Sequence, residues 1–346
     1  MFSTLFAVVV ALVLGHVAPA LAAGLRDYGW FAALLGWLGR RFPDDGFRRG
    51  RWGLALALVP VVLVVGLVQW LLDGIAFGLP ALAFGVAAVF YAWGPRDLDL
   101  DVQAVIDAPD AAARGEALAR LRPAAAAGAG QARDEVGRVF VAALRRWFGV
   151  LFWFVVLGAV GALLYRLVAF AAEDEPALHL PEGTLEGGRR LLAVLDWPVA
   201  QLMALSLALV GNFDVVVSAW KGAGGAALRS GADMLAAVGR ASVRWELDEE
   251  AGDFGAHAAE ATDAADAADA AQPAGAVGDA AAAAAMAGFG SVSGDADAVP
   301  AGAGAATEAL GAPLVQAMRD AMSLVWRVLL AWLAVLALFV VAGWVN

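Results

Sequence analysis

The chain has 346 residues, of which 62% are hydrophobic and 16% charged, and this balance excludes an ordinary soluble domain, where about 25% of residues are charged. It contains no cysteine, which excludes disulfides, thiolate metal ligands and a cysteine nucleophile. Much of the net charge of -11 comes from an Ala/Asp-rich stretch near the C-terminus, so we expect no nucleic-acid partner.

Uncharged stretches of about 20 residues recur along the chain, and each is long enough to cross the hydrocarbon core as a helix. We expect clear spans at residues 1–25, 52–72, 74–95, 147–165 and 328–346, the first three of them within 1–95. A further segment, 191–213, is interrupted by Asp196 and Pro198, and it either crosses the membrane or enters and returns. The predicted fold is therefore an all-α polytopic membrane protein with five or six transmembrane or re-entrant helices.

The order of charges around the first span predicts its fate and the orientation of the protein. No Lys or Arg precedes its apolar run, whereas six arginines follow it between residues 26 and 51, the reverse of a cleavable signal peptide. By the positive-inside rule that loop lies in the cytoplasm, and so does 96–146, which carries eight arginines. We expect a bacterial inner-membrane protein with a periplasmic N-terminus and with the acidic connection 173–186 also outside.

The segments between the spans have distinct compositions. Residues 28–41 place apolar side chains at helical spacing and end in two arginines, which predicts a helix in the headgroup layer. Residues 96–146 predict a cytoplasmic helical loop, and 147–249 include the fourth span, the acidic loop, the interrupted segment and an amphipathic helix. Residues 250–312 are rich in Ala, Gly and Asp, so we expect a disordered acidic tether before the last helix, 313–346.

Ionisable groups at membrane depth are candidate functional residues, because each is costly unless it is paired or solvated. On the helix that enters the fourth span, Asp134, Arg138 and Arg145 share one face, either as an ordinary end that snorkels to the phosphate layer or as a ligand site. Asp196 would pair with Arg166. The predicted ligand-binding residues are Asp134, Arg138, Arg145, Tyr165, Arg166, Asp196, Asn212 and Asp214.

Motifs for other chemistry are missing from the sequence. The chain has three scattered histidines, which disfavours a zinc site and a catalytic triad, and we expect neither a metal site nor catalytic residues. His16 lies within the first span, where an imidazole bonded to a neighbouring carbonyl is favoured over a proton relay. No Gly-Lys-Ser/Thr phosphate loop occurs.

Short motifs carry a family resemblance. The Phe-Trp and Tyr-Arg pairs within 151–166, the Gly-Pro-Arg-Asp-Leu at 94–98, and the Leu-Asp-Trp-Pro at 195–198 with Ala-Leu-Val-Gly at 208–211 are the motifs concerned. They resemble the AmpE family and its relatives, the adenosylcobinamide-phosphate synthases of the CobD/CbiB type. The resemblance covers most of residues 1–245 and a terminal helix.

Departures from the synthase pattern favour the AmpE branch. In the synthases, an Asn and an acidic residue precede the Phe-Trp pair, and an Asn-Thr-Leu-Asp follows the Tyr-Arg pair. An ungapped alignment places Ala142 and Arg145 at the first two positions, and Ala169 and Ala172 at the others. The synthases' Pro-Ala-Arg becomes Val-Ala-Gln at 199–201. Methyl groups cannot bind a nucleotide or Mg²⁺, so cobinamide synthesis is disfavoured.

The resemblance implies an inner-membrane regulatory protein that modulates β-lactamase induction linked to cell-wall recycling, without turnover of its own. Its expected partners are the lipid bilayer, a nucleotide or cell-wall-derived ligand, and other membrane or cell-wall recycling proteins. The alternative is a membrane-bound synthase that uses ATP and Mg²⁺, in which Asp134, Arg138 and Arg145 would hold phosphate; nucleotide sensing is compatible with both. A transporter is disfavoured, because buried charges are few and no inverted repeat is visible.

Overall fold

A computed structural model describes residues 6–11, 28–41, 52–93, 97–121, 135–174, 176, 180–228, 231–270 and 302–342. Every regular element in these ranges is a helix, which confirms the all-α prediction. The chain divides into two units, one made of residues up to Trp245 together with Leu314 onward, and the other of Glu246–Pro313.

Four helical stretches among the described residues are long and apolar enough to cross a membrane, so this is a membrane protein: Gly53–Leu72, Glu135–Leu157, Glu182–Val210 and Pro313–Val341. The elements are α3 (Gly29–Arg41), α4 (Gly53–Leu72), the 3-10 turn η1 (Ile75–Gly78), α5 (Leu79–Ala92), α6 (Leu98–Ile106), α7 (Ala111–Arg120), α8 (Glu135–Ala143), the π-helical turn η3 (Leu144–Phe148), α9 (Gly149–Leu157), α10 (Ala159–Glu173), α11 (Glu182–Val210), α12 (Phe213–Gly222), α13 (Gly231–Ala270) and α14 (Gly302–Val341). The helix predicted at residues 28–41 is present as α3, from Gly29 to Arg41, and of the predicted first span only 6–11 are described.

Helix α4 presents an apolar surface that fits contact with lipid. Leu63, Val64, Leu67 and Trp70 are 66%, 62%, 55% and 72% exposed. In water such a face would be a large uncovered patch, whereas in a bilayer hydrocarbon covers it.

The predicted fourth span, residues 147–165, is not one helix but the tip of a helical hairpin. Gly158 separates α9 from α10 with a φ of 68°, a left-handed conformation that glycine adopts without strain. The two helices then pack side by side, so that Gly149 on α9 lies directly under the ring of Tyr165 on α10. Hydropathy could not predict the reversal, since neither a charge nor a proline interrupts this stretch.

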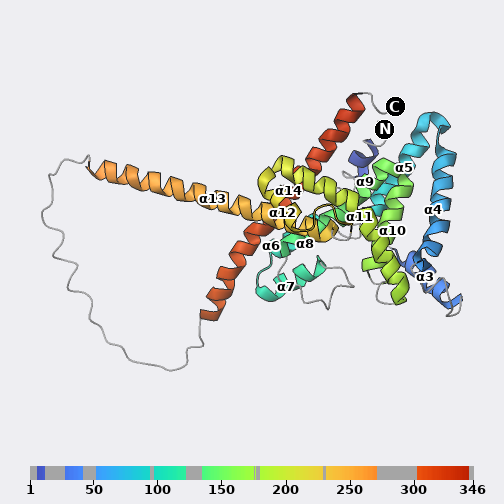
Figure 1. The fold of residues 1–346 in the computed structure, drawn as a ribbon, viewed down its shortest axis with the longest axis horizontal. Coiled ribbons are helices and arrows are strands. Elements are labelled where there is room, and N and C mark those ends of the chain that lie inside the picture. The colour runs from blue at the N-terminus through green and yellow to red at the C-terminus, as the bar shows by residue number, and fades with distance from the viewer. Residues whose placement is uncertain are drawn as a thin grey trace, which may run out of the picture. The chain divides into compact units, whose positions relative to one another are not determined.

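Helix α4 lies beside α10 and α5 (Figure 1), and its contacts define two ends of this bundle. At one end, a Cβ on Gly188 would lie 3.1 Å from the Leu54 side chain and 3.9 Å from Ala172. At the other, Gln69 bonds the backbone on both sides of Gly158, at 3.2 and 3.4 Å. The start of α4, the end of α10 and the start of α11 therefore share one end, which we call the arginine end.

The hairpin reverses the predicted side of the acidic connection 173–186. Arg145, ahead of α9, forms an ion pair with Glu173, and Arg166 lies 3.6 Å from Asp174. Glu173 and Asp174, at the start of the connection, and the beginning of α11, at its end, therefore lie at the arginine end, together with the basic residues that precede the hairpin. The prediction treated 147–165 as one crossing helix, whereas the chain reverses at Gly158 within it and returns Glu173 to Arg145.

Residues 191–210 of the interrupted segment lie within one continuous helix, α11, which includes Asp196 and Pro198 and ends at Val210. The chain then returns beside it in α12. Gln201 accepts a hydrogen bond from Trp220 Nε1 at 2.8 Å and donates one to the Gly225 carbonyl at 3.1 Å. The segment is thus part of a membrane-length helix whose second half is paired with a returning helix.

Helix α14 packs on the hairpin through aromatic side chains. The ring of Trp326 lies 5.2 Å from that of Trp147, and the ring of Trp332 lies 5.0 Å from that of Phe148. Trp326 also donates a hydrogen bond to Asp99 at 3.4 Å. The part of α14 at Trp326 therefore lies beside α6.

The predicted disordered tether, 250–312, is helical where the structure describes it. Helix α13 continues to Ala270 and α14 already begins at Gly302. Alanine has the highest helix propensity, so an Ala-rich stretch can be helical without the large apolar residues on which the prediction depended. Residues 271–301 lie outside the described residues.

The hairpin predicts which positions share a side of the membrane. Because the chain has no cysteine, single-cysteine variants can be labelled without background. Gly115, Glu182 and Asp73 are exposed. We expect a membrane-impermeant maleimide to label Gly115→Cys and Glu182→Cys from the same face of sealed vesicles and Asp73→Cys from the opposite face. Labelling of Glu182→Cys together with Asp73→Cys from one face would contradict the hairpin.

Candidate functional site

The helical stretch from α8 to α9 changes type where it carries two adjacent arginines, Arg145 and Arg146. Leu144–Phe148 is a π-helical turn between α8 and α9. Such turns recur at functional sites, because the wider turn shifts the direction in which neighbouring side chains point. Arg145 forms its ion pairs with residues of α10 and α11, whereas Arg146 forms its ion pair with α6. The turn therefore supplies two positive charges to two separate sets of partners.

Arg145 belongs to a buried network at the arginine end. Its Nε donates to Asp196 Oδ2 at 3.3 Å, and the Tyr165 hydroxyl donates to Asp196 Oδ1 at 2.6 Å. Arg145 also forms an ion pair with Glu173. Asp196 is 2% exposed and Tyr165 is fully buried. Each oxygen of the buried carboxylate thus has a donor, as the cost of burying a charge requires.

Gly149 allows Tyr165 to reach this network. A Cβ at position 149 would overlap the Tyr165 ring and its hydroxyl oxygen. Only glycine leaves room for the ring to lie against the α9 backbone. The close approach of α9 and α10 therefore positions the Tyr165 hydroxyl against Asp196 on a neighbouring helix, α11.

Arg146 connects the hairpin to the helices that precede it. Its Nη1 donates to Asp101 Oδ2 at 2.7 Å, and its Nη2 donates to the Arg120 carbonyl at 3.1 Å. Asp101 is only 1% exposed. A buried charge pair of this kind is costly to break from one side, so α6 and α7 are held against the arginine end.

Arg166 lies on α10 with a side chain that is 5% exposed. Its Nη2 is 3.6 Å from Asp174, a distance for an ion pair but longer than a normal hydrogen bond. Its guanidinium lies 5.3 Å from the centre of the Tyr28 ring, within range of a cation–π contact. Its Nε is buried, with no hydrogen-bond partner among the described residues. Burial raises the pKa of the Asp174 carboxyl more than Arg166 lowers it.

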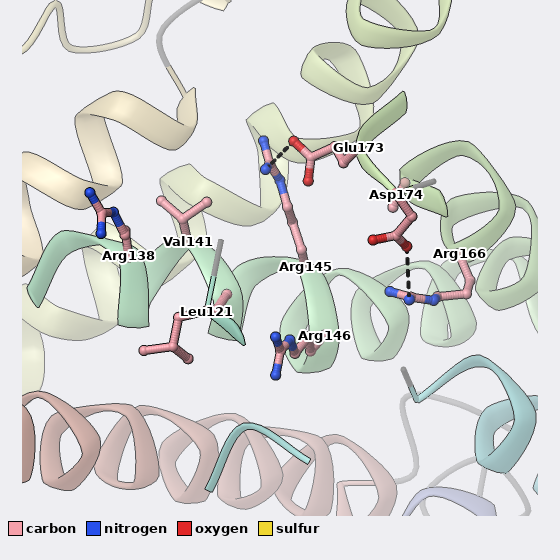
Figure 2. A pocket seen from close by; sticks show the side chains of 10 residues that line it. Leu121, Arg138, Val141, Arg145, Arg146, Arg166, Glu173 and Asp174 are labelled. Atoms are coloured by element: carbon pink, nitrogen blue, oxygen red, sulfur yellow. Dashed lines mark ion pairs between the residues drawn. The ribbon is translucent and has the colours of Figure 1, made fainter. Parts of the chain in front are cut away.

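These arginines line one open cavity with a volume of about 110 Å³, which is smaller than the roughly 300–1,000 Å³ of sites for drug-sized ligands. Figure 2 shows Arg138, Arg145 and Arg146 along one helical stretch, with Arg145 pointing toward Glu173 and Arg166 lying beside Asp174. The lining residues are Leu121, Arg138, Val141, Ala142, Arg145, Arg146, Arg166, Ala169, Glu173 and Asp174. Four arginines against two carboxylates give the lining a net positive charge of two.

The structure brings most of the predicted site residues together. Arg138, Arg145 and Arg166 line the cavity, and Tyr165 and Asp196 form the network behind it. Of the three residues predicted to share a face, Arg138 and Arg145 both line this cavity, and Asp134 lies outside the described residues. The predicted pair of Asp196 with Arg166 is wrong. Asp196 binds Arg145 and Tyr165, whereas Arg166 pairs with Asp174.

The remaining predicted residues lie elsewhere. Asn212 is the N-cap of α12, where its side chain accepts a hydrogen bond from the Val215 amide at 3.1 Å. Asp214 is exposed in the first turn of α12, a position that favours a negative charge at any helix. Asp134 and His16 lie outside the described residues.

Sequence reasoning missed Asp101, Arg146, Glu173 and Asp174. Arg146 directly follows a predicted residue, and the signal that it faces elsewhere is the π turn, which the sequence does not reveal. The two acidic residues after α10 join the site only because the hairpin returns them to it.

The described residues do not fit a Mg²⁺ site. No three His, Asp or Glu side chains within them converge so as to hold a metal ion. Glu173, Asp174 and Asp196 are each paired with an arginine instead. An arginine-rich lining suits an anion rather than a hard cation, whose ligands are oxygens.

Comparison of the chain with protein-family models, with curated proteins and with solved structures finds no match. The AmpE resemblance therefore depends on the short motifs alone.

Proposed function

We propose that this protein is an AmpE-type regulatory protein of the bacterial inner membrane, which binds a small cytoplasmic ligand and modulates β-lactamase induction linked to cell-wall recycling. The observation that carries the proposal is the arginine-lined cavity at one end of a membrane-helix bundle. By the positive-inside rule, this end faces the cytoplasm.

The positions of the resemblance support this choice. Ala142, Arg145 and Ala169 stand where the synthase motifs carry polar residues, and all three line the cavity. Segments that are far apart in the motif pattern thus meet at one site. Because methyl groups replace the polar side chains there, binding without turnover is the better proposal.

The ion pairs give the cavity a means of regulation. Arg146 connects it to α6 through Asp101, and Arg145 connects it to α11 through Asp196. A ligand that draws either arginine away from its carboxylate favours a different packing of these helices. The ligand acts only through its different affinity for the two packings.

A deletion strain of the native host tests the proposal. We expect deletion to change β-lactamase induction severalfold, and re-expression of the wild-type chain to restore it. Arg138→Gln, which changes the cavity lining, should restore it poorly at an equal membrane level. Arg190→Gln is the matched control, because Arg190 is half exposed and pairs only with the neighbouring Glu186 among the described residues. Unchanged induction and unchanged muropeptide pools in the deletion strain would refute the regulatory role.

A further inference from the structure

We infer that the arginine-lined cavity binds a phosphomonoester group directly through Arg145, Arg146 and Arg166. This inference rests on the proposed function, since it names the chemistry of the ligand at the same site. The phosphate is held by guanidinium groups drawn from two arms of the hairpin, η3 and α10.

The first argument is the supply of donors. A guanidinium has five N–H donors in a planar fork that matches two phosphate oxygens. Arg145 uses Nε and Nη1 for its ion pairs with Asp196 and Glu173. Arg146 uses its two Nη atoms for Asp101 and for the Arg120 carbonyl. Two contacts for each arginine are fewer than its five N–H donors, so donors remain for a phosphate.

Arg166 gives the second argument, because it places an unpartnered donor at the cavity. Its side chain is 5% exposed, and Nε finds no acceptor among the described residues. Figure 2 shows it reaching from α10 toward Arg145 and Arg146. A buried donor without a partner is costly, and a phosphate oxygen supplies the missing acceptor.

Charge is the third argument. The lining residues alone carry a net positive charge of two, and Asp101 and Asp196 behind them balance it, so a phosphomonoester dianion binds by displacing a carboxylate from an arginine. Asp101 and Asp196 reduce the field from outside the lining, where they pair with Arg146 and Arg145. The site therefore suits reversible binding, as a sensor needs.

Asp174 occupies the place that the phosphate takes on Arg166. Its side chain is 35% exposed and its oxygen is 3.6 Å from Nη2, so this contact is looser than the other pairs of the cavity. Burial raises the pKa of this carboxyl, which agrees with a weakly stabilised negative charge. Phosphate, with more negative charge and more acceptor oxygens, competes with it for Arg166.

A titration of the full-length protein in detergent tests the inference. We expect inorganic phosphate to bind the wild type in a calorimetric titration. Its affinity for Arg166→Gln should be lower by at least about tenfold. Asp174→Asn should bind severalfold more tightly, because it removes the competing charge. Arg190→Gln, which removes an exposed arginine on α11, should bind like the wild type. An equal effect of Arg166→Gln and Arg190→Gln overturns the inference, as does an unchanged affinity in Asp174→Asn.

The same phosphate chemistry has two sources, a soluble phosphorylated compound and the headgroup of phosphatidic acid. A second arm places the protein in nanodiscs with phosphatidylcholine alone or with added phosphatidic acid, and measures the retained lipid by native mass spectrometry. Binding of inorganic phosphate identifies the soluble source. The headgroup is identified as the source if the wild type retains phosphatidic acid, Arg166→Gln loses it, and inorganic phosphate does not bind. Binding of neither overturns the inference.

The two proposals fail separately. If Arg166→Gln abolishes phosphate binding but a strain that carries this variant has unchanged β-lactamase induction, the regulatory role is refuted and the phosphate site stands. Altered induction in a protein that binds neither probe refutes the phosphate site alone.

Discussion

Asp196→Ala is expected to lower the free energy of unfolding by about 3 kcal/mol, because removing one partner of a buried ion pair leaves the other charge uncompensated. Arg145 loses the acceptor of its Nε, and the fully buried Tyr165 hydroxyl loses the oxygen that lies 2.6 Å away. Glu173 still pairs with Arg145, so the loss stays at the low end for such a change. Thermal unfolding in detergent and the steady-state level in the membrane measure it.

Two variants make this prediction specific. Asp196→Asn keeps an acceptor for the Tyr165 hydroxyl but removes the charge, so its loss should lie between the wild type and Asp196→Ala. Asp214→Ala removes an exposed acid from the first turn of the adjacent helix, and we expect less than about 1 kcal/mol there. If Asp196→Ala and Asp214→Ala unfold alike, the buried network does not hold the helices together.

The fold class could be predicted because lipid imposes a simple rule on sequence. A membrane helix needs a long uncharged run, and Arg51 and Asp73 bracket such a run around α4. The same rule failed at residues 147–165, which are uniformly apolar. There a single glycine with positive φ, Gly158, reverses the chain. Hydropathy carries no information about backbone conformation, so it cannot predict this reversal.

The failure at Gly158 explains most of what the site prediction missed. The cost of burying charge selected Arg166 and Asp196, which lie at the site, but also Asn212 and Asp214, which lie at the start of α12. Choosing partners for Arg166 and Asp196 required the pairing of α9 with α10, which no local pattern encodes. Arg166 was therefore assigned to Asp196, although a residue that follows α10, Asp174, lies beside it.

For residues 250–312 the prediction weighed composition alone, and the described parts, 250–270 and 302–312, are helical. Few large apolar residues argue against a core, but they do not argue against a helix. Residues 250–270 continue α13 because alanine favours the helix by its backbone alone. A sequence of low hydropathy can be either disordered or helical. Helix propensity therefore has to be considered separately from hydropathy.

Gly149→Ala is expected to lower the free energy of unfolding by about 3 kcal/mol, although it adds a single methyl group. The new Cβ would overlap the buried Tyr165 ring, so either the ring leaves Asp196 or α9 and α10 separate. Thermal unfolding in detergent measures the loss.

Matched variants connect that loss to the overlap with Tyr165. Gly66→Ala is the control within a membrane helix, because its Cβ would meet only Val160 at an ordinary 3.7 Å. Tyr165→Leu shrinks the opposing side chain, so adding it to Gly149→Ala should cost clearly less than the sum of the two single changes. Additive losses would mean that the two residues do not touch, and the hairpin would then lack the close approach that brings the hydroxyl to Asp196.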